Sequence, residues 1–249
     1  MTSEDNLLLA RLNDCINSSQ KKQFPSFIGF LTEHEASVAL QYLNKQQTGS
    51  YKLYGGYPNA ERCVLGISHH NAEIEDYYYP VSGVSFSYKK EFALTHRDFL
   101  GSFMGLGIKR ETIGDILTGS GYSVAFIKDD IKDYLLSQIT KIGNVGVTIE
   151  EWDGYTLPVV DNRKVLGCTV SSPRLDGVVS AVIPLSREKA ASAIKQGLVF
   201  VNGIAVCNVS YTVKEQDKIS VRGKGKFIVS EFSGTTKKGR LKLTVEKYI

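Results

Sequence analysis

The chain has 249 residues and a formal net charge of +4, and 42% of its residues are hydrophobic. This composition excludes global disorder, and the length is sufficient for two or three domains. No apolar run approaches the ~18 residues that a membrane-spanning helix requires, so we expect no membrane span. The N-terminal stretch MTSEDNLLLARLNDC begins acidic and lacks the basic region of a signal peptide, which favours a cytoplasmic location.

The cysteines and histidines follow no metal-binding or disulfide pattern. The four cysteines are scattered at positions 15, 63, 168 and 207, and no pair has the spacing of zinc ligands or of a disulfide framework. The pair His69-His70 is more typical of the end of a strand than of a metal site. We therefore expect a reducing environment, no metal and no cofactor.

Charge is distributed unevenly along the chain. Residues 1–170 carry 16 Lys/Arg and 20 Asp/Glu, a net of −4, whereas residues 171–249 carry 14 Lys/Arg and 6 Asp/Glu, a net of +8. A basic final third indicates a polyanionic partner for that third, with a merely solubilising surface as the alternative.

Residues 1–75 predict a small N-terminal α/β domain. A helix is expected over 4–19, and a second one follows Thr32, which caps it with Glu35 at the third position of a capping box. Leu31, Val38, Leu40 and Leu43 are expected to form its apolar face. The stretches SYKLYGG and ERCVLGISH then predict short strands around a Gly-Gly-Tyr-Pro turn. No functional site is evident in this segment.

Residues 76–155 predict the order β-α-β-β-α-β. The order starts with a strand at VSGVSFSYKKE, a helix capped by Thr95 and a hairpin turning at 119–121. A helix over 129–143 and a strand at VGVTIEEW complete it. It is the ferredoxin-like arrangement that RNA-recognition-motif (RRM) domains share. The aromatic RNA-binding signature of those domains is absent, which argues against base stacking on the sheet.

Two short stretches of the first 155 residues remain open to two interpretations. The first is the cluster of Lys109, Arg110, Glu111 and Asp115. It forms either a solvated turn with a local salt bridge, which we favour, or a second contact, to RNA or the ribosome, through Lys109 and Arg110. The nearby glycines do not form a nucleotide loop, because they end a helix rather than begin one. The tyrosine run DYYYP at 76–80 is either a partner patch or, as we favour, buried interdomain packing.

Residues 156–172 are expected to be a linker with a short strand, and residues 173–249 a separate basic domain. Leu175, Val178, Val179 and Val182 are spaced as one face of a helix. Ser186 is expected to cap a second helix that ends at Gly197. A turn at Asn202-Gly203 joins two strands, and the segment VKEQDKISVRGKGKF adds a turn and a further strand.

The motif RLD…SR..A…I..G.V.VNG…D.ISVRG.GKF, from Arg174 to Phe227, resembles the S4-type (alpha-L) RNA-binding domain. The stretches GTTKKGRLKLTVEKY, LTHRDFLGSFMGLGIKRETIGDI and GGYPNAERC extend the resemblance to YlmH-type bacterial RNA-binding proteins over nearly the whole chain. This resemblance implies an α+β chain with an N-terminal α/β domain, a central RRM-like domain and a C-terminal S4-type domain.

The same resemblance implies a non-enzymatic binder of structured RNA. Its partners would be rRNA and peptidyl-tRNA on the large ribosomal subunit, in ribosome-associated quality control. Some relatives carry a cell-division name, so cell-division proteins are a further expected partner class.

Basic residues near helix starts and flexible turns are the candidate RNA contacts. Arg187 and Lys189 lie in the first turn of a helix, where a cation opposes the helix dipole and suits a bound phosphate instead. The resemblance assigns the main contact to Arg187, with Arg174 and Lys189 beside it. The remaining candidates are Ser186, Arg222, Lys224, Lys226, Lys237, Lys238 and Arg240, with Asp176, Asn202 and Gly203 as structural support.

Asp176 also allows a catalytic interpretation, because pseudouridine synthases keep a catalytic aspartate in an Arg-Leu-Asp motif. Only 73 residues follow Asp176, and the S4 pattern occupies most of them. A carboxylate in the first turn of a helix suits the dipole and can orient a nearby arginine. We therefore expect a supporting role, with an RNA-modifying enzyme and a protein-interaction adaptor as the alternative functions.

Overall fold

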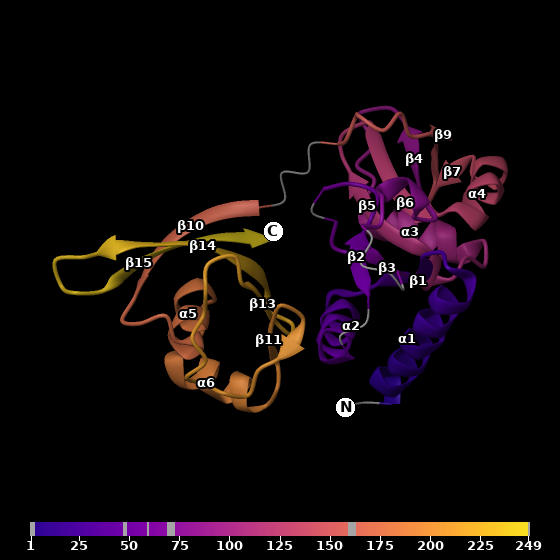
Figure 1. Cartoon of the computed structure of the whole chain (residues 1–249). Coiled ribbons are helices and arrows are strands. Elements are labelled where there is room, and N and C mark those ends of the chain that lie inside the picture. The colour runs from indigo at the N-terminus through magenta and orange to yellow at the C-terminus, as the bar shows by residue number, and fades with distance from the viewer. Residues whose placement is uncertain (1–2, 47–48, 59, 69–72, 159–162, 249) are drawn as a thin grey trace. The chain divides into compact units, whose positions relative to one another are not determined.

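The computed structural model describes residues 3–46, 49–58, 60–68, 73–158 and 163–248. The chain divides into two compact units, residues 1–160 and 161–249 (Figure 1). Helices and strands are mixed in both units, which confirms the α+β class. Within the described residues, no helix combines the length and apolarity needed to span a membrane.

The first unit begins with a three-stranded antiparallel sheet covered by two helices. Its elements are α1 (Ser3–Lys22), β1 (Ser26–Leu31), α2 (Glu33–Gln46), β2 (Ser50–Tyr54) and β3 (Cys63–Ser68), with the strand order β1-β3-β2. The predicted capping box is confirmed, because the Glu35 carboxylate accepts hydrogen bonds from the Thr32 backbone N–H and hydroxyl. Strand β1 was not predicted. Of the predicted apolar face, Leu43 is buried and Val38 packs against the same core, whereas Leu40 does not belong to that cluster and Leu31 lies in β1 instead of α2.

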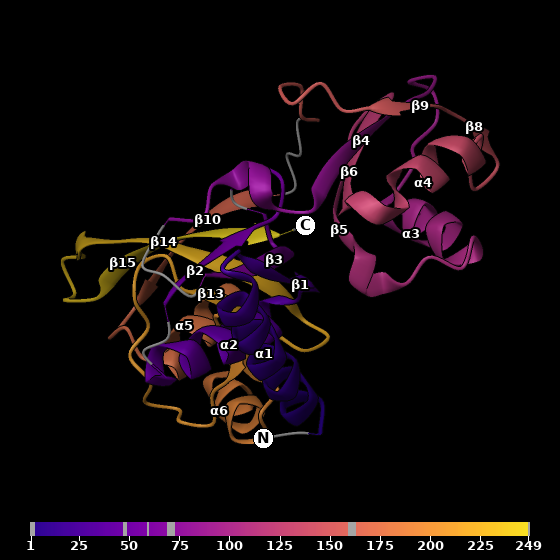
Figure 2. The same cartoon turned by 45° about the vertical axis from the view of Figure 1, so that its right-hand side comes forward.

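The rest of this unit has the predicted β-α-β-β-α-β order. It comprises β4 (Val81–Ser87), α3 (His96–Gly105), β5 (Ile113–Thr118), β6 (Tyr122–Lys128), α4 (Lys132–Gln138) and β9 (Thr148–Glu151), with the antiparallel strand order β5-β6-β4-β9. Helices α3 and α4 cover one face of this sheet (Figure 2). Thr95 caps α3 in a capping box with Asp98, as predicted.

Short elements complete the first unit and correct one boundary. Three single 3₁₀ turns lie at Asp76–Tyr78, Arg110–Thr112 and Asp129–Ile131. Helix α4 ends at Gln138 rather than at the predicted Gly143. The residues after it form a small hairpin of β7 (Lys141–Ile142) and β8 (Val145–Gly146), in which Gly143 adopts a φ of 55°.

The second face of the central sheet is covered by the N-terminal part of the same unit. Tyr57 stacks on Phe126 of β6 with ring centroids 4.7 Å apart, and Trp152 meets the same ring edge-on at 5.3 Å. Phe30 of β1 and Tyr79 are buried in the same cluster. The face on which RRM domains stack bases is thus filled by the protein's own side chains, and the residues before and after position 75 share a hydrophobic core.

The second unit is a six-stranded antiparallel sheet packed against two helices. It comprises β10 (Arg163–Val170), α5 (Leu175–Val182), α6 (Arg187–Lys195), β11 (Val199–Val201), β12 (Ile204–Ala205), β13 (Lys218–Val221), β14 (Gly225–Thr235) and β15 (Leu241–Tyr248), with the strand order β10-β15-β14-β13-β11-β12. All four apolar positions predicted for the first helix are buried.

Two features of this sheet refine the sequence interpretation. Residues 156–172, expected to be a linker, include the full-length strand β10, which pairs with β15 along eight residues. The predicted turn between β11 and β12 has positive φ angles at both Asn202 and Gly203, 50° and 79°. The Asn202 side chain donates to Asp217 at 2.9 Å, which ties this turn to the start of β13.

Candidate nucleic-acid interface

The first part of the candidate interface is the start of helix α5. Arg174 is the N-cap residue with extended backbone, and Leu175 is fully buried, which fixes the orientation of the first turn. Asp176 follows in that turn with only 5% of its surface exposed. A carboxylate at this position is favoured by the dipole of the helix but needs partners because it is buried.

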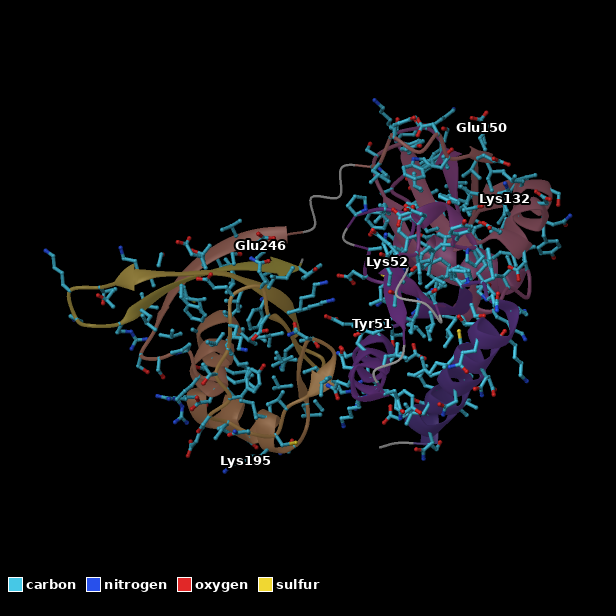
Figure 3. All side chains as sticks on the ribbon, in the orientation of Figure 1. Tyr51, Lys52, Lys132, Glu150, Lys195 and Glu246 are labelled. Carbon is cyan, nitrogen blue, oxygen red and sulfur yellow. The ribbon has the colours of Figure 1, made fainter. Side chains whose placement is uncertain are left out.

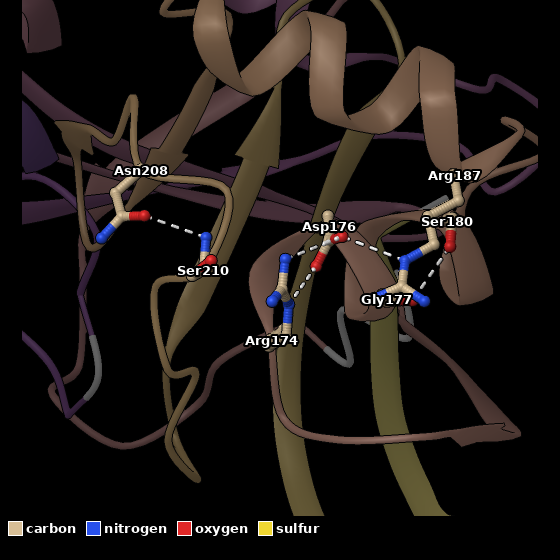
Figure 4. Close-up of polar contacts among 7 residues, drawn as sticks. All are labelled: Arg174, Asp176, Gly177, Ser180, Arg187, Asn208 and Ser210. Carbon is tan, nitrogen blue, oxygen red and sulfur yellow. Dashed lines mark hydrogen bonds and ion pairs between the residues drawn. The ribbon is translucent and has the colours of Figure 1, made fainter.

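Asp176 obtains these partners from two arginines (Figure 4). The Nε atom of Arg174 donates to Oδ1 at 3.1 Å, and the Nε atom of Arg187 donates to Oδ2 at 3.0 Å. Burial opposes ionisation of the carboxyl, but the hydrogen bonds from both arginines outweigh it, so the pKa of Asp176 lies below its ordinary value. The buried carboxylate therefore holds two guanidinium groups whose side chains remain 41% and 54% exposed, those of Arg174 and Arg187.

The second part is the start of helix α6. Ser186 is its N-cap, and its hydroxyl accepts a hydrogen bond from the Lys189 backbone N–H at 3.2 Å, as predicted. Arg187 is the first helical residue, and Arg187 and Lys189 are both exposed. The Ser186 hydroxyl thus satisfies one free backbone N–H of the first turn, while the basic side chains of this turn remain accessible to an anion.

The third part is Arg240, at the end of the turn between β14 and β15. Its Nε atom donates to the Thr169 hydroxyl at 3.1 Å, and its Nη2 atom donates to the Thr169 carbonyl oxygen at 2.7 Å. Arg240 and Arg187 line one concavity of about 330 Å³, together with Ser171, Gly177 and Ser180. Two arginines, each oriented by a different neighbour, thus share one opening with polar walls.

The other basic candidates fall into two groups at opposite ends of strand β14. Lys237 and Lys238 lie in the exposed β14–β15 turn beside Arg240. Arg222 and Lys224 lie in the β13–β14 turn, and Lys226 stands over the Tyr248 ring at 5.2 Å. Because β14 spans eleven residues, the two turns are separated by roughly 33 Å. The structure therefore divides the predicted basic set into a group near Arg187 and a distant group.

The predicted solvated turn at Lys109 and Arg110 is wrong for Arg110. Its guanidinium is half-buried, and Nη1 donates to the Ile113 carbonyl oxygen at 2.6 Å. Lys109 is exposed. Sequence reasoning missed Thr169, which lies in the presumed linker, and Arg62, which donates to the same Ile113 oxygen at 3.0 Å. Neither residue belongs to a local pattern that could have revealed its contacts.

The remaining sequence candidates behave differently from one another. In the tyrosine run, Tyr79 is buried and its hydroxyl donates to the Lys52 carbonyl oxygen at 2.7 Å, while Tyr77 is 75% exposed. The prediction of buried packing is thus correct for Tyr79, while the more exposed Tyr78 meets the ring of Phe24 edge-on at 5.2 Å. His69 and His70 lie outside the described residues. Among the side chains that the structure describes, no group of three or more His, Cys, Asp or Glu residues could hold a metal ion.

Comparison with known proteins finds two RNA-binding family models along the chain. The family model described as "Putative RNA-binding domain in YlmH" matches residues 73–155, and the S4 domain model matches residues 173–219. The ribosome-associated protein quality control protein P2 of Bacillus subtilis (strain 168) is 33% identical over 222 residues, which cover 88% of this chain and 85% of the relative.

A solved structure shares the fold of part of the chain. The cell division protein ylmH from Streptococcus pneumoniae has a TM-score of 0.53 and 21% identity, and the match covers 61% of this chain and 93% of that one. At this identity the likeness concerns the fold alone.

The S4 domain, with its arginines around a polar opening, identifies an RNA-binding protein. The particular family follows from the Bacillus relative, because the aligned sequences cover most of both chains at 33% identity. The chain belongs to the YlmH family, as the sequence resemblance had implied.

Proposed function

We propose that this protein binds structured RNA on the large ribosomal subunit, contacting rRNA and peptidyl-tRNA in ribosome-associated quality control. The name of the Bacillus relative supports the ribosomal setting. In this proposal the chain acts in the cytoplasm as a binder rather than as an enzyme.

The observation that carries the proposal is the concavity shared by Arg187 and Arg240. Guanidinium groups match the geometry of phosphate oxygens, and a polar opening between two of them fits one backbone phosphate. Ser171 and Ser180 place hydroxyl groups in the same walls. Structured RNA presents phosphates and 2′-hydroxyls at fixed spacing, so such a site would recognise shape more than sequence.

The environment of Asp176 supports binding over catalysis. Both of its carboxylate oxygens accept hydrogen bonds from arginines, and the side chain is 93% buried. A nucleophile or general base needs access to its substrate, which this position does not offer. The carboxylate is better suited to orienting the two arginines.

Sedimentation with purified large subunits tests the proposal. We expect the variant Arg174→Ala/Arg187→Ala to lose co-sedimentation at moderate salt, whereas Lys195→Ala on the far end of α6 keeps it. The binding constant should fall with salt at a log–log slope of about −3 to −5, if ~4–6 phosphates are contacted. Unchanged co-sedimentation of the double variant would contradict the proposal.

A further inference from the structure

Two half-buried arginines of the first unit share one hydrogen-bond acceptor. Arg62 Nε and Arg110 Nη1 donate to the Ile113 carbonyl oxygen at 3.0 Å and 2.6 Å. Arg62 Nη2 also donates to the Phe30 carbonyl oxygen at 2.9 Å. These bonds fix two guanidinium groups side by side, although their charges repel each other.

The positive charge of this pair is not neutralised by a salt bridge. The nearby carboxylate of Asp115 accepts from the Tyr57 hydroxyl at 2.8 Å and from the backbone N–H groups of Glu61 and Arg62 at 2.6 Å and 3.1 Å. Within the described residues, neither guanidinium forms an ion pair with a carboxylate. Carbonyl oxygens therefore satisfy part of the donors of this half-buried pair, and its charge is not matched by a carboxylate in direct contact.

The titration behaviour of Arg110 and His96 agrees with a local excess of positive charge, although the Asp115 carboxylate raises both pKa values in part. Burial, followed by repulsion from Arg62, lowers the pKa of Arg110 to about 10. Burial alone lowers the pKa of Arg62, against the attraction of Glu35 and Asp115. Burial and then the charge of Arg110 lower the pKa of His96. Both arginines nevertheless remain charged at neutral pH.

The arginine pair opens onto a concavity of about 540 Å³. Arg11 of α1 and the exposed Lys109 also line it, so four cationic side chains face two carboxylates, Glu35 and Glu111. The Glu35 carboxylate is already engaged by the Thr32 backbone N–H and hydroxyl at 2.7 Å and 2.8 Å. The opening therefore keeps a positive balance and unused guanidinium donors.

We propose that this concavity, lined by Arg11, Arg62, Lys109 and Arg110, binds a phosphate group of an RNA backbone. The planar donors of two adjacent arginines suit phosphate oxygens, and the anion would give the pair the direct ionic partner that no described carboxylate supplies. The inference rests on the proposed RNA-binding function, and it gives the first unit an RNA contact of its own, separate from the Arg187–Arg240 concavity and from the covered sheet face.

The test uses the full chain carrying Arg187→Ala and Arg240→Ala, so that the C-terminal concavity does not dominate binding. Lys109→Glu is added because Lys109 is exposed and its replacement should not affect folding. Lys141→Glu is the matched control, since Lys141 is an exposed lysine of the same unit that does not line the concavity. Circular dichroism checks that both variants are folded.

Two probes are then compared. The first probe is 20 mM inorganic phosphate, compared with chloride at equal ionic strength. We expect phosphate to raise the melting temperature of the Lys141→Glu chain by about 1–2 °C more than that of the Lys109→Glu chain. With a fluorescein-labelled RNA hairpin at low salt, Lys109→Glu should weaken binding about 5-fold relative to Lys141→Glu. Both results together support an RNA phosphate as the ligand.

The other outcomes overturn the proposal in distinguishable ways. A phosphate-dependent shift without any difference in RNA affinity would overturn RNA as the source and indicate a small phosphorylated ligand. Equal behaviour of both variants with both probes would overturn the site, leaving the arginines as ties between β1, the 110–112 turn and β5. Neither outcome bears on the C-terminal concavity, because its two arginines are absent from every chain compared.

Discussion

Arg187 of helix α6 is anchored to Asp176 of helix α5, with 3.0 Å between Nε and Oδ2. The two residues are eleven positions apart, and each lies in the first turn of its helix. The carboxylate is buried, while the arginine side chain is 54% exposed. The pair therefore presents a cation to solvent in a fixed direction, and this reduces the side-chain entropy that would be lost when the arginine binds an anion.

Replacing Asp176 by Asn should weaken RNA binding without altering any basic residue. Asn keeps the volume but loses the charge-assisted bonds to Arg174 and Arg187, so both guanidinium groups should become mobile. We expect RNA affinity to fall by about 1 kcal/mol, measured by fluorescence anisotropy with a labelled RNA hairpin. An affinity equal to that of the wild type would show that orientation by Asp176 is unimportant.

The pH dependence of stability should show how much the ionised Asp176 carboxylate stabilises the fold. The folded-state pKa of Asp176 lies below the ordinary value of 3.8. Its stabilisation is therefore fully present above pH 3.8 and is lost as the pH falls through the lower, folded-state pKa. The difference in melting temperature between wild type and Asp176→Asn should be constant near neutral pH and shrink only below pH 3.8. A difference that disappears between pH 5 and 7 would contradict this assignment.

Arg187→Ala and Arg240→Ala should each lower RNA affinity by about 1–2 kcal/mol and reduce the magnitude of the salt slope by about 1. Because both side chains line one concavity, their effects on affinity should be coupled, and the double variant should lose less than the sum of the single losses. Lys195→Ala serves as the control, since Lys195 projects from the end of α6 away from the sheet (Figure 3). Fully additive losses would show that the two arginines contact different phosphates.

The elements that the sequence predicted best are those defined by neighbouring residues. Helix α5 follows from the spacing of its four buried residues, and the start of α6 follows from Ser186 as its cap. The anchoring of Arg240 by Thr169 could not be predicted, because 71 positions separate the two residues. Strand β10, which carries Thr169, was expected only as a short strand within a linker, since its pairing with β15 is a tertiary property.

The same limit explains the errors in the first unit. Arg110 and Glu111 suggested a solvated turn from their local composition. Arg110 is instead held against strand β5, because Arg62 and the N-terminal sheet close over it. Strand β1 was overlooked because six residues between two helices give little periodicity, although four of them are buried. In both cases packing between distant segments outweighed the local signal.

The cysteines should differ strongly in reactivity. Burial raises the pKa of the Cys15 thiol to about 12, whereas Cys207 is exposed. The thiolate is the reactive form, so iodoacetamide at pH 8 should label Cys207 in the native protein and Cys15 only after unfolding. Peptide mass spectrometry measures both sites in one sample. Equal labelling rates in the native protein would show that the α1 core opens readily.

Gly56→Ala tests whether the covered face of the central sheet holds the first unit together. Gly56 has a φ of 96°, and a Cβ atom there would collide with the ring of Phe126, which stacks on Tyr57. Both the unfavourable backbone and the clash should destabilise the unit, by about 2–4 kcal/mol together.

Gly146→Ala is the control, because an added Cβ atom there meets open space. Thermal unfolding followed by the fluorescence of Trp152, the only tryptophan, reports on this unit directly, since that ring contacts Phe126. If the Gly56→Ala variant melts like the control, Tyr57 does not close the sheet face in solution, and that face would then be accessible to an RNA base.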